Sequence, residues 1–320
     1  MIDLLKQIYH PMVRHLAWSL LSPDLACVKH VHPLRFSSNP ELANWLAQLD
    51  ANPHPLEDYI YSGNHRLLGS YFERLWQFFF IHHPDWSLLA HHVQIRNKKQ
   101  TLGELDLLVQ DAQGTVIHLE LATKWYLQIP NCSGGESKHW LGPQTQDRLD
   151  LKLHKLTAKQ FPFAFNKHTL EHLNIQGLPQ PDIQQLVLKG GLFYKWNSHH
   201  RLAPEVPSDT QLFPWSHGHE IEQWIDLKGH YMLLEKHQWL APAIICETDV
   251  EPQPAQAIIK IIHDHFDKNK AENASRPPYA LMLCQVIHMN ETTYWQEINR
   301  TMVVHKNWPN AFKSELKVEQ

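Results

Sequence analysis

The sequence has few cysteines and no long hydrophobic run. Its four cysteines lie far apart and form no CxxC motif, which is typical of reduced thiols rather than a disulfide framework. Charged residues interrupt the apolar positions of residues 1–26, so this segment lacks the continuous apolar stretch of a signal peptide. No apolar run approaches the roughly 20 residues that a membrane-spanning helix needs. We therefore expect a soluble, cytoplasmic protein with no membrane partner.

The motifs of several enzyme classes are also missing. The sequence has 25 histidines but neither HExxH nor Cys and His pairs at zinc-site spacing. It has no GxSxG motif of serine hydrolases. Gly190 and Gly191 lack the context of a nucleotide-binding loop, so we expect a strand bulge or a tight turn there. A net charge of −4 argues against nonspecific coating of nucleic acid but leaves room for a local basic surface.

What the sequence does contain is abundant apolar and aromatic residues. A chain of 320 residues with 43% hydrophobic residues and 12 Trp, 12 Phe and 9 Tyr predicts a globular protein with a sizeable core. Residues 64–81 have the strongest helical pattern, with Asn64 as the expected N-cap. Further helices are expected within residues 1–22, 35–58 and 145–160, three strands within 91–127, and short strands with proline-rich loops from about residue 165. This order predicts a mixed α/β fold.

Residues 103–125, GELDLLVQDAQGTVIHLELATKW, place charges inside two predicted strands. Pairing each residue i with residue 226 − i puts the leucines opposite one another, so one face of the hairpin is entirely apolar. A shift by one residue mixes buried and polar positions and is rejected on packing grounds. In the favoured register Asp106 lies opposite Glu120, and the same face carries Glu104, His118, Ala122 and Lys124.

Two interpretations of this polar face stay open. Two carboxylates about 4.5–5.5 Å apart raise each other's proton affinity unless a cation lies between them, and Mg²⁺ takes oxygen ligands of this kind. The face would then be one wall of a metal site. Alternatively, acids that alternate with leucines are what the solvated face of any half-buried antiparallel sheet displays.

Basic residues recur on the helix expected after the hairpin. Arg148, Lys152, Lys155 and Lys159 follow one another at steps of four, three and four, which lines them along one helix face. The neighbouring stripe, Leu149, Leu153, Leu156 and Gln160, is expected to be mostly buried. Four cations beside a metal site suit the phosphates of a nucleic acid. An ordinary solvated helix face accounts for the same pattern.

The succession of elements resembles known families. The helix with Glu73 in GSYFERLW, then GELDLL, HLELATK and the helix after GPQTQDRLDLKL resemble the common core of the PD-(D/E)XK nuclease superfamily over about residues 64–160. From VRHLAWSLLSP onward, most of the chain resembles a bacterial family, domain-of-unknown-function family 1853, associated with that superfamily. The resemblance implies a restriction-endonuclease-like core 64–160 with helices flanking a central sheet. The residue pattern adds a helical segment 1–63 before it and a C-terminal α/β extension 161–320 of strands and loops, which either continues this domain or forms another.

The superfamily resemblance also implies roles for individual residues. Asp106 and Glu120 match the two acidic ligands of Mg²⁺ or Mn²⁺, and Glu73 matches a helix glutamate at the edge of the site. The usual lysine stands two residues after the second acid, where this sequence has Ala122, so Lys124 is the candidate that orients or activates water. The implied reaction is metal-assisted hydrolysis of phosphodiester bonds, which His118 could assist.

Two functions therefore stay open. The first is a metal-dependent endonuclease or exonuclease that acts on DNA or RNA. The second is a nuclease-like fold without catalytic activity that serves as a nucleic-acid-binding or protein-assembly module. Asp106, Glu120 and Glu73 favour the first, whereas the displaced lysine and the acidic overall charge favour the second. The sequence sets neither the choice between DNA and RNA nor the oligomeric state.

Overall fold

The computed structural model describes residues 2–97, 100–246, 248, 250–267, 279–289 and 293–309. The described residues fall into two compact units, the first within 1–124, 151–190 and 205–210 and the second within 125–150, 191–204 and 211–320. Two long strands, β4 and β6, each begin in the first unit and end in the second. The division into segments 1–63, 64–160 and 161–320 stays a prediction.

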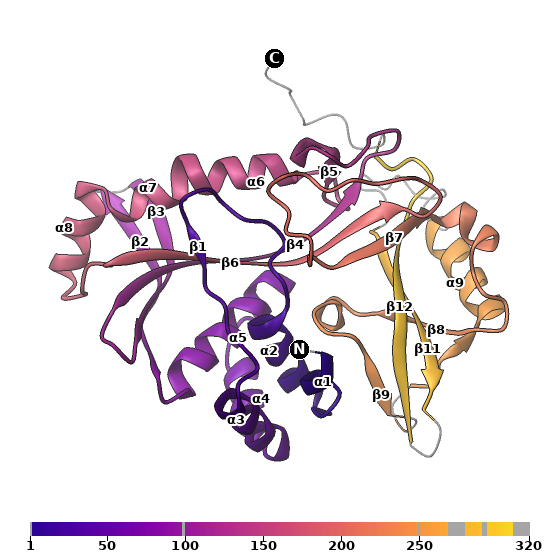
Figure 1. Cartoon of the computed structure of the whole chain (residues 1–320), viewed down its shortest axis with the longest axis horizontal. Coiled ribbons are helices and arrows are strands. Elements are labelled where there is room, and N and C mark those ends of the chain that lie inside the picture. The colour runs from indigo at the N-terminus through magenta and orange to yellow at the C-terminus, as the bar shows by residue number, and fades with distance from the viewer. Residues whose placement is uncertain are drawn as a thin grey trace. The chain divides into compact units, whose positions relative to one another are not determined.

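The first unit is built from helices on both sides of a sheet (Figure 1). Strands β2, β3, β4 and β6 lie side by side in this order, and β1 pairs in parallel with β6. The first half supplies α1 (Ile2–Leu5), α2 (Pro11–Leu21), β1 (His32–Pro33), α3 (Pro40–Ala51), α4 (His54–Tyr61), α5 (Leu68–His82), β2 (Trp86–Asn97), β3 (Gln100–Asp111) and β4 (Val116–Gln128). The second half supplies α6 (Leu149–Lys155), the π-helical turn η2 (Leu156–Gln160), α7 (Phe161–Ala164), α8 (Lys167–Ile175) and β6 (Ile183–Lys195).

Helix α5 carries the aromatic core of the first unit. Its side chains Tyr71, Phe72, Trp76 and Phe79 are buried, as the helical spacing of the sequence predicts. The expected N-cap was wrong, however, because the helix begins at Leu68 and Leu67 holds the extended N-cap conformation. No side chain caps this end. The predicted start is too early because Leu67 continues the apolar spacing of the helix although residues 64–67 are not helical.

The hairpin of β3 and β4 has the predicted register. Leu107 pairs with Leu119 and Val109 with Ile117, and all four side chains are buried. The pairing of leucines across the hairpin was therefore sufficient to fix which residues share a face. Helices cover both faces of this sheet: α6, α7 and α8 lie on one side and α2 to α5 on the other (Figure 1). On the polar side of the hairpin His118 and Glu120 are buried, whereas Glu104, Asp106 and Lys124 are half-buried.

Gly190 marks a close approach between two strands of the first unit. Its φ angle is +141°, and a Cβ atom there would overlap the carbonyl oxygen of Lys124 on β4. Glycine has no Cβ and adopts such a φ at little cost. Gly190 lies inside the continuous strand β6 and not in a tight turn, and the physical reason for a glycine here is the backbone contact between β6 and β4.

The second unit is a mixed sheet covered by one long helix. It contains the ends of β4 and β6, β7 runs parallel to both β6 and β12, and the order continues β12, β11, β8 and β10. Its elements are η1 (Ser137–His139), β5 (Trp140–Leu141), β7 (Leu212–His217), η3 (Gly218–Gln223), β8 (His230–Leu234), η4 (His237–Trp239), β9 (Ile244–Cys246), β10 (Gln253–Pro254), α9 (Ala255–Asp267), β11 (Leu281–His288) and β12 (Tyr294–Val304). Ile258, Ile262 and Phe266 of α9 pack onto this sheet in one apolar cluster.

The mixed α/β fold that the sequence predicts is confirmed. Helices α8 and α9 were not expected in a strand-and-loop extension, and α9 begins inside a segment that its prolines marked as a loop. All four cysteines lie in the described part of the chain, and each is a free thiol. Within the same part of the chain, none of the helices combines the length and the apolar character that crossing a membrane requires.

Candidate functional site

The predicted acidic pair comes together in the first unit, at the polar side of the β3–β4 hairpin. Glu120 on β4 is 1% exposed, and Asp106 on β3 is half-buried. The Asp106 carboxylate accepts a hydrogen bond from the backbone N–H of Leu121, with Oδ2 3.0 Å from the nitrogen. This contact holds the Asp106 side chain against β4, next to Leu107 and Leu119, where the described pairing of the two strands ends.

The pKa of Asp106 shows how unfavourable this location is for a negative charge. Burial is the main cause that raises the pKa of Asp106 to about 7, and the negative charges of Glu120 and Glu73 raise it further. The hydrogen bond from Leu121 and the positive charge of Lys152 act in the opposite direction without cancelling the effect. A carboxylate so perturbed by burial and by its neighbours is typical of functional sites.

Beside this pair lies His118, which is fully buried. Its Nε2 is 3.2 Å from Glu120 Oε1, but the contact does not have hydrogen-bond geometry. Glu120 Oε1 and both ring nitrogens of His118 have no hydrogen-bond partner among the described residues. The interpretation of this strand face as a solvated surface does not hold for His118 and Glu120, although Glu104 on the same face is partly exposed. Buried polar atoms without partners are rare in proteins, and they commonly mark the place of an ion, a water molecule or a catalytic role.

The other oxygen of Glu120 is bound by the helical segment that follows the hairpin. Gln160 donates a hydrogen bond from Nε2 to Glu120 Oε2, and its Oε1 lies 3.3 Å from Lys152 Nζ. Eight residues of regular α-helix would turn Gln160 by about 80° away from Lys152. The π-helical turn η2 turns less per residue and brings both side chains to the same face. π-Turns of this kind are frequent at functional sites.

Lys152 is consequently not part of an outward-facing basic stripe. The charges of Glu120 and Asp106 act on its ammonium group, although burial is the largest influence and lowers its pKa. Lys155 and Lys159 are exposed. Arg148 belongs to the second unit, where its guanidinium binds both carboxylate oxygens of Asp150 at 2.6 and 2.9 Å. The predicted row of four phosphate-binding cations is thus divided into one inward lysine, two solvent-facing lysines and one paired arginine.

Glu73 on α5 lies close enough to Asp106 for its negative charge to raise the pKa of that carboxyl group. Burial raises the pKa of Glu73 itself, and the charge of Glu104 on β3 raises it further. His92 lies between the two acids, with Nε2 3.4 Å from Glu73 and Nδ1 2.9 Å from Glu104. His92 has a φ of +49°, and the β2–β3 pairing is irregular nearby, so the strand locally turns this imidazole toward the acids.

Lys124 is half-buried on β4. Its positive charge lowers the pKa of Lys152, so the two ammonium groups are near enough to repel each other. Sequence reasoning did not assign His92 or Gln160 to the site. The weak signals for them were one of the HH pairs and a polar residue in an otherwise apolar helix stripe.

The fold and this site together define a mixed α/β protein with a buried acidic pair, flanked by a lysine, a glutamine and a histidine. The chain belongs to the family described as a domain of unknown function, DUF1853, whose model matches residues 14–304. Comparison with curated proteins and with solved structures gives no match.

The residues of the cluster fit a divalent cation. Asp106 and Glu120 supply two carboxylates, and the buried Glu120 Oε1 has a free acceptor position. A cation next to both groups would remove the repulsion that raises the pKa of Asp106. Hard ions such as Mg²⁺ and Mn²⁺ prefer oxygen ligands and retain several waters, which suits a site that offers two carboxylates.

Proposed function

We propose that this protein is a metal-dependent nuclease of the PD-(D/E)XK type that hydrolyses phosphodiester bonds in DNA or RNA. The observation that supports this proposal most strongly is the buried Glu120 oxygen without a hydrogen-bond partner, located beside Asp106, whose pKa is about 7. Two acids that repel each other in a buried site cost folding free energy, and a bound Mg²⁺ or Mn²⁺ offsets that cost.

Each residue of the cluster has a proposed role. Asp106 and Glu120 hold the ion, which when bound polarises a phosphoryl oxygen and lowers the pKa of a water molecule. Lys152 shares with Lys124 the role of the lysine that orients or activates water in the superfamily. The reason is that the charges of Glu120 and Asp106 both act on the Lys152 ammonium. Its positive charge stabilises the negative charge that develops on the phosphate. Glu73, positioned by His92, borders the site.

Gln160 and His118 act on Glu120 rather than on the substrate. Gln160 fixes the orientation of the carboxylate by donating to Oε2, and the opposite oxygen would be the one that holds the ion. The His118 ring, whose nitrogens have no hydrogen-bond partner among the described residues, lies 3.2 Å from that opposite oxygen and limits how far the carboxylate can turn. The exposed Lys155 and Lys159 are placed to contact phosphates of the nucleic-acid backbone.

A second candidate function is a nuclease-like fold that binds nucleic acid or assembles with proteins without cleaving. It is favoured by Ala122, which occupies the position of the usual lysine, and by the hydrogen bond with which Gln160 satisfies half of the Glu120 carboxylate. In this case the cluster would bind no ion, and Lys152 alone would balance the acids.

A cleavage assay separates the two functions. Single- and double-stranded DNA and RNA are incubated with the full chain and Mg²⁺ or Mn²⁺, and the products are resolved on gels. Asp106→Ala and Glu120→Ala should each lower cleavage by at least about 100-fold. Asp111→Asn is the matched control, because Asp111 lies on the same hairpin and accepts backbone N–H groups of its turn at 2.8 and 3.0 Å.

The control should retain wild-type cleavage, since an asparagine oxygen can accept the same hydrogen bonds. Cleavage that survives in both alanine variants would contradict the proposed site. Binding of nucleic acid without metal-dependent cleavage would support the second function.

A further inference from the structure

A second group of metal-binding side chains lies in the second unit, where β7 ends and η3 begins. His217, His219 and Glu220 each offer one ligand atom, and these atoms lie within 4.8 Å of one another. The sequence around them, HGHE, matches no common zinc motif. The proximity arises because β7 passes directly into a tight 3₁₀ turn, which folds Glu220 back over His217.

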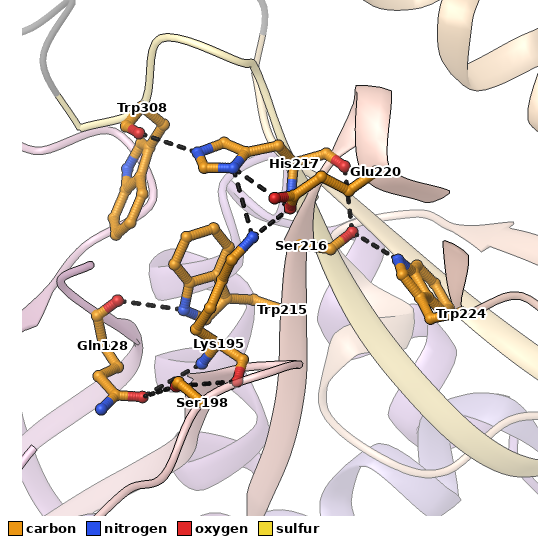
Figure 2. A network of polar contacts seen from close by, with 9 residues as sticks. All are labelled: Gln128, Lys195, Ser198, Trp215, Ser216, His217, Glu220, Trp224 and Trp308. Atoms are coloured by element: carbon orange, nitrogen blue, oxygen red, sulfur yellow. Dashed lines mark hydrogen bonds and ion pairs between the residues drawn. The ribbon is translucent and has the colours of Figure 1, made fainter. Parts of the chain in front are cut away.

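The ring of His217 is held in a defined orientation (Figure 2). Its Nε2 lies 3.1 Å from the carbonyl oxygen of Trp308, so this nitrogen carries the proton and donates it. The lone pair is therefore on Nδ1, which faces Glu220 Oε2 at 3.3 Å. A backbone carbonyl that accepts from the remote ring nitrogen is the usual way in which proteins orient a histidine ligand.

The spacing of these two atoms suits one tetrahedral ion. Zinc binds nitrogen and carboxylate oxygen at about 2.0–2.1 Å, so two ligands of the same tetrahedral ion lie roughly 3.3–3.4 Å apart. The measured separation of 3.3 Å between His217 Nδ1 and Glu220 Oε2 agrees with this value. Two imidazoles and one carboxylate are also a ligand set that zinc uses when a fourth position stays open.

The ammonium group of Lys195 already lies beside His217 and Glu220, the two ligands with fixed orientation. Lys195 on β6 donates its ammonium to Glu220 Oε2, and its Nζ lies 3.4 Å from His217 Nδ1 (Figure 2). The same ammonium lies 4.8 Å from the centre of the Trp215 ring, so the lysine stem is packed along an aromatic wall. The protein thus places a cation of its own where a metal ion would bind both ligands.

We propose that His217, His219 and Glu220 form a Zn²⁺ site in which the Lys195 ammonium occupies the cation position until zinc displaces it. His219 is exposed, and it also lines a pocket of about 200 Å³ that contains His263, His305 and Lys306. An exposed side chain can turn toward the other two ligands without disturbing the core. Because His219 also lines this pocket, together with Asp267, a fourth zinc ligand would be a water molecule that enters from the pocket.

Substitution of Lys195 tests the displacement directly. Zn²⁺ binding to the full, tag-free chain is measured by isothermal titration, and Co²⁺ is used in parallel because its absorption spectrum reports tetrahedral coordination. Lys195→Met removes the competing charge and keeps an apolar stem against Trp215. It should bind one Zn²⁺ at least ten-fold more tightly than the wild type, since zinc no longer has to displace a cation.

His219→Gln provides the second variant, because an exposed side chain can be replaced without loss of folding. In the Lys195→Met background it should abolish the tight site, whereas His230→Gln, which alters another exposed histidine of the same unit, should leave it intact. The proposal is overturned if Lys195→Met binds no more tightly than the wild type. It is equally overturned if tight binding persists after His219→Gln. Circular dichroism of each variant confirms that the comparison is made between folded proteins.

Discussion

Replacement of Asp106 by asparagine should stabilise the metal-free protein. The carboxylate is buried near Glu120 and Glu73, and the pKa of Asp106 is raised from 3.8 to about 7 by burial and by those charges. Asparagine removes the charge and keeps an oxygen that can accept the Leu121 N–H. A substitution that damages a metal site is therefore expected to increase the free energy of unfolding.

The size of the effect follows from the pKa shift. A folded-state pKa above the unfolded-state value favours the protonated form in the folded protein, so stability falls as the pH rises through the interval from about 4 to about 7. A shift from 3.8 to about 7 corresponds to at most about 4 kcal/mol at 1.36 kcal/mol per pKa unit. Asp106→Asn also loses the attraction between the carboxylate and Lys152, which reduces the benefit. The free energy of unfolding should therefore increase by about 1–4 kcal/mol above pH 7.

Urea denaturation of both proteins in EDTA at pH 5 and pH 8 measures this difference. The stabilisation by asparagine should be larger at pH 8, where the wild-type carboxylate is ionised, than at pH 5. Mg²⁺ should stabilise the wild type at pH 8 but leave Asp106→Asn unchanged, because the variant lacks a ligand. A variant that is equally or less stable than the wild type at pH 8 would refute the reasoning.

Three further substitutions test other parts of the structure. Lys152→Met should lower metal-dependent cleavage by about 100-fold, whereas Lys167→Met, at an exposed lysine of α8 with no proposed role, should change the initial rate by less than a few-fold. Asp24→Asn should cost about 3–5 kcal/mol in urea denaturation, because it leaves the ammonium of Lys189, which is 1% exposed and 3.0 Å from Asp24, without its buried counter-charge. Gly190→Ala should cost about 3 kcal/mol or more in thermal or urea unfolding, since its φ is +141° and a methyl group would overlap the facing strand of the sheet.

The acidic pair could be predicted from the sequence because strand pairing has a strict two-residue period. The leucines of β3 and β4 can face one another in only one register, and that register puts Asp106 and Glu120 on the same side. No contact between residues distant in sequence had to be known, because both strands belong to one hairpin. The burial of this polar side could not be predicted from the same pattern, because it depends on helices that are distant in sequence.

The surroundings of the pair depend on backbone irregularities that no regular pattern encodes. A helical wheel places Lys152 with Lys155 and Lys159, and only the π-helical turn brings Gln160 to Lys152 and Glu120. Similarly, alternation along β2 does not predict that His92 turns toward Glu73, because its positive φ breaks the alternation. Sequence analysis therefore located the two acids but missed the residues that position them.

The second unit was the least predictable part of the fold. Its sheet combines the ends of β4 and β6 with six described strands from the last third of the chain, so its order follows from distant pairings rather than local pattern. Helix α9 has its apolar residues at Ile258, Ile262 and Phe266, a spacing of four that is visible in the sequence. The prolines just before it suggested a loop and concealed the start of the helix.

The central claim is that Asp106 and Glu120 bind a divalent ion. Anomalous diffraction from crystals of the full chain grown with Mn²⁺ tests it most directly. We predict an anomalous peak in the wild type within bonding distance of both carboxylates, and its loss in Glu120→Gln. Absence of a peak between these two acids in the wild type, with manganese present in the crystal, would contradict the proposed metal site and the nuclease function that rests on it.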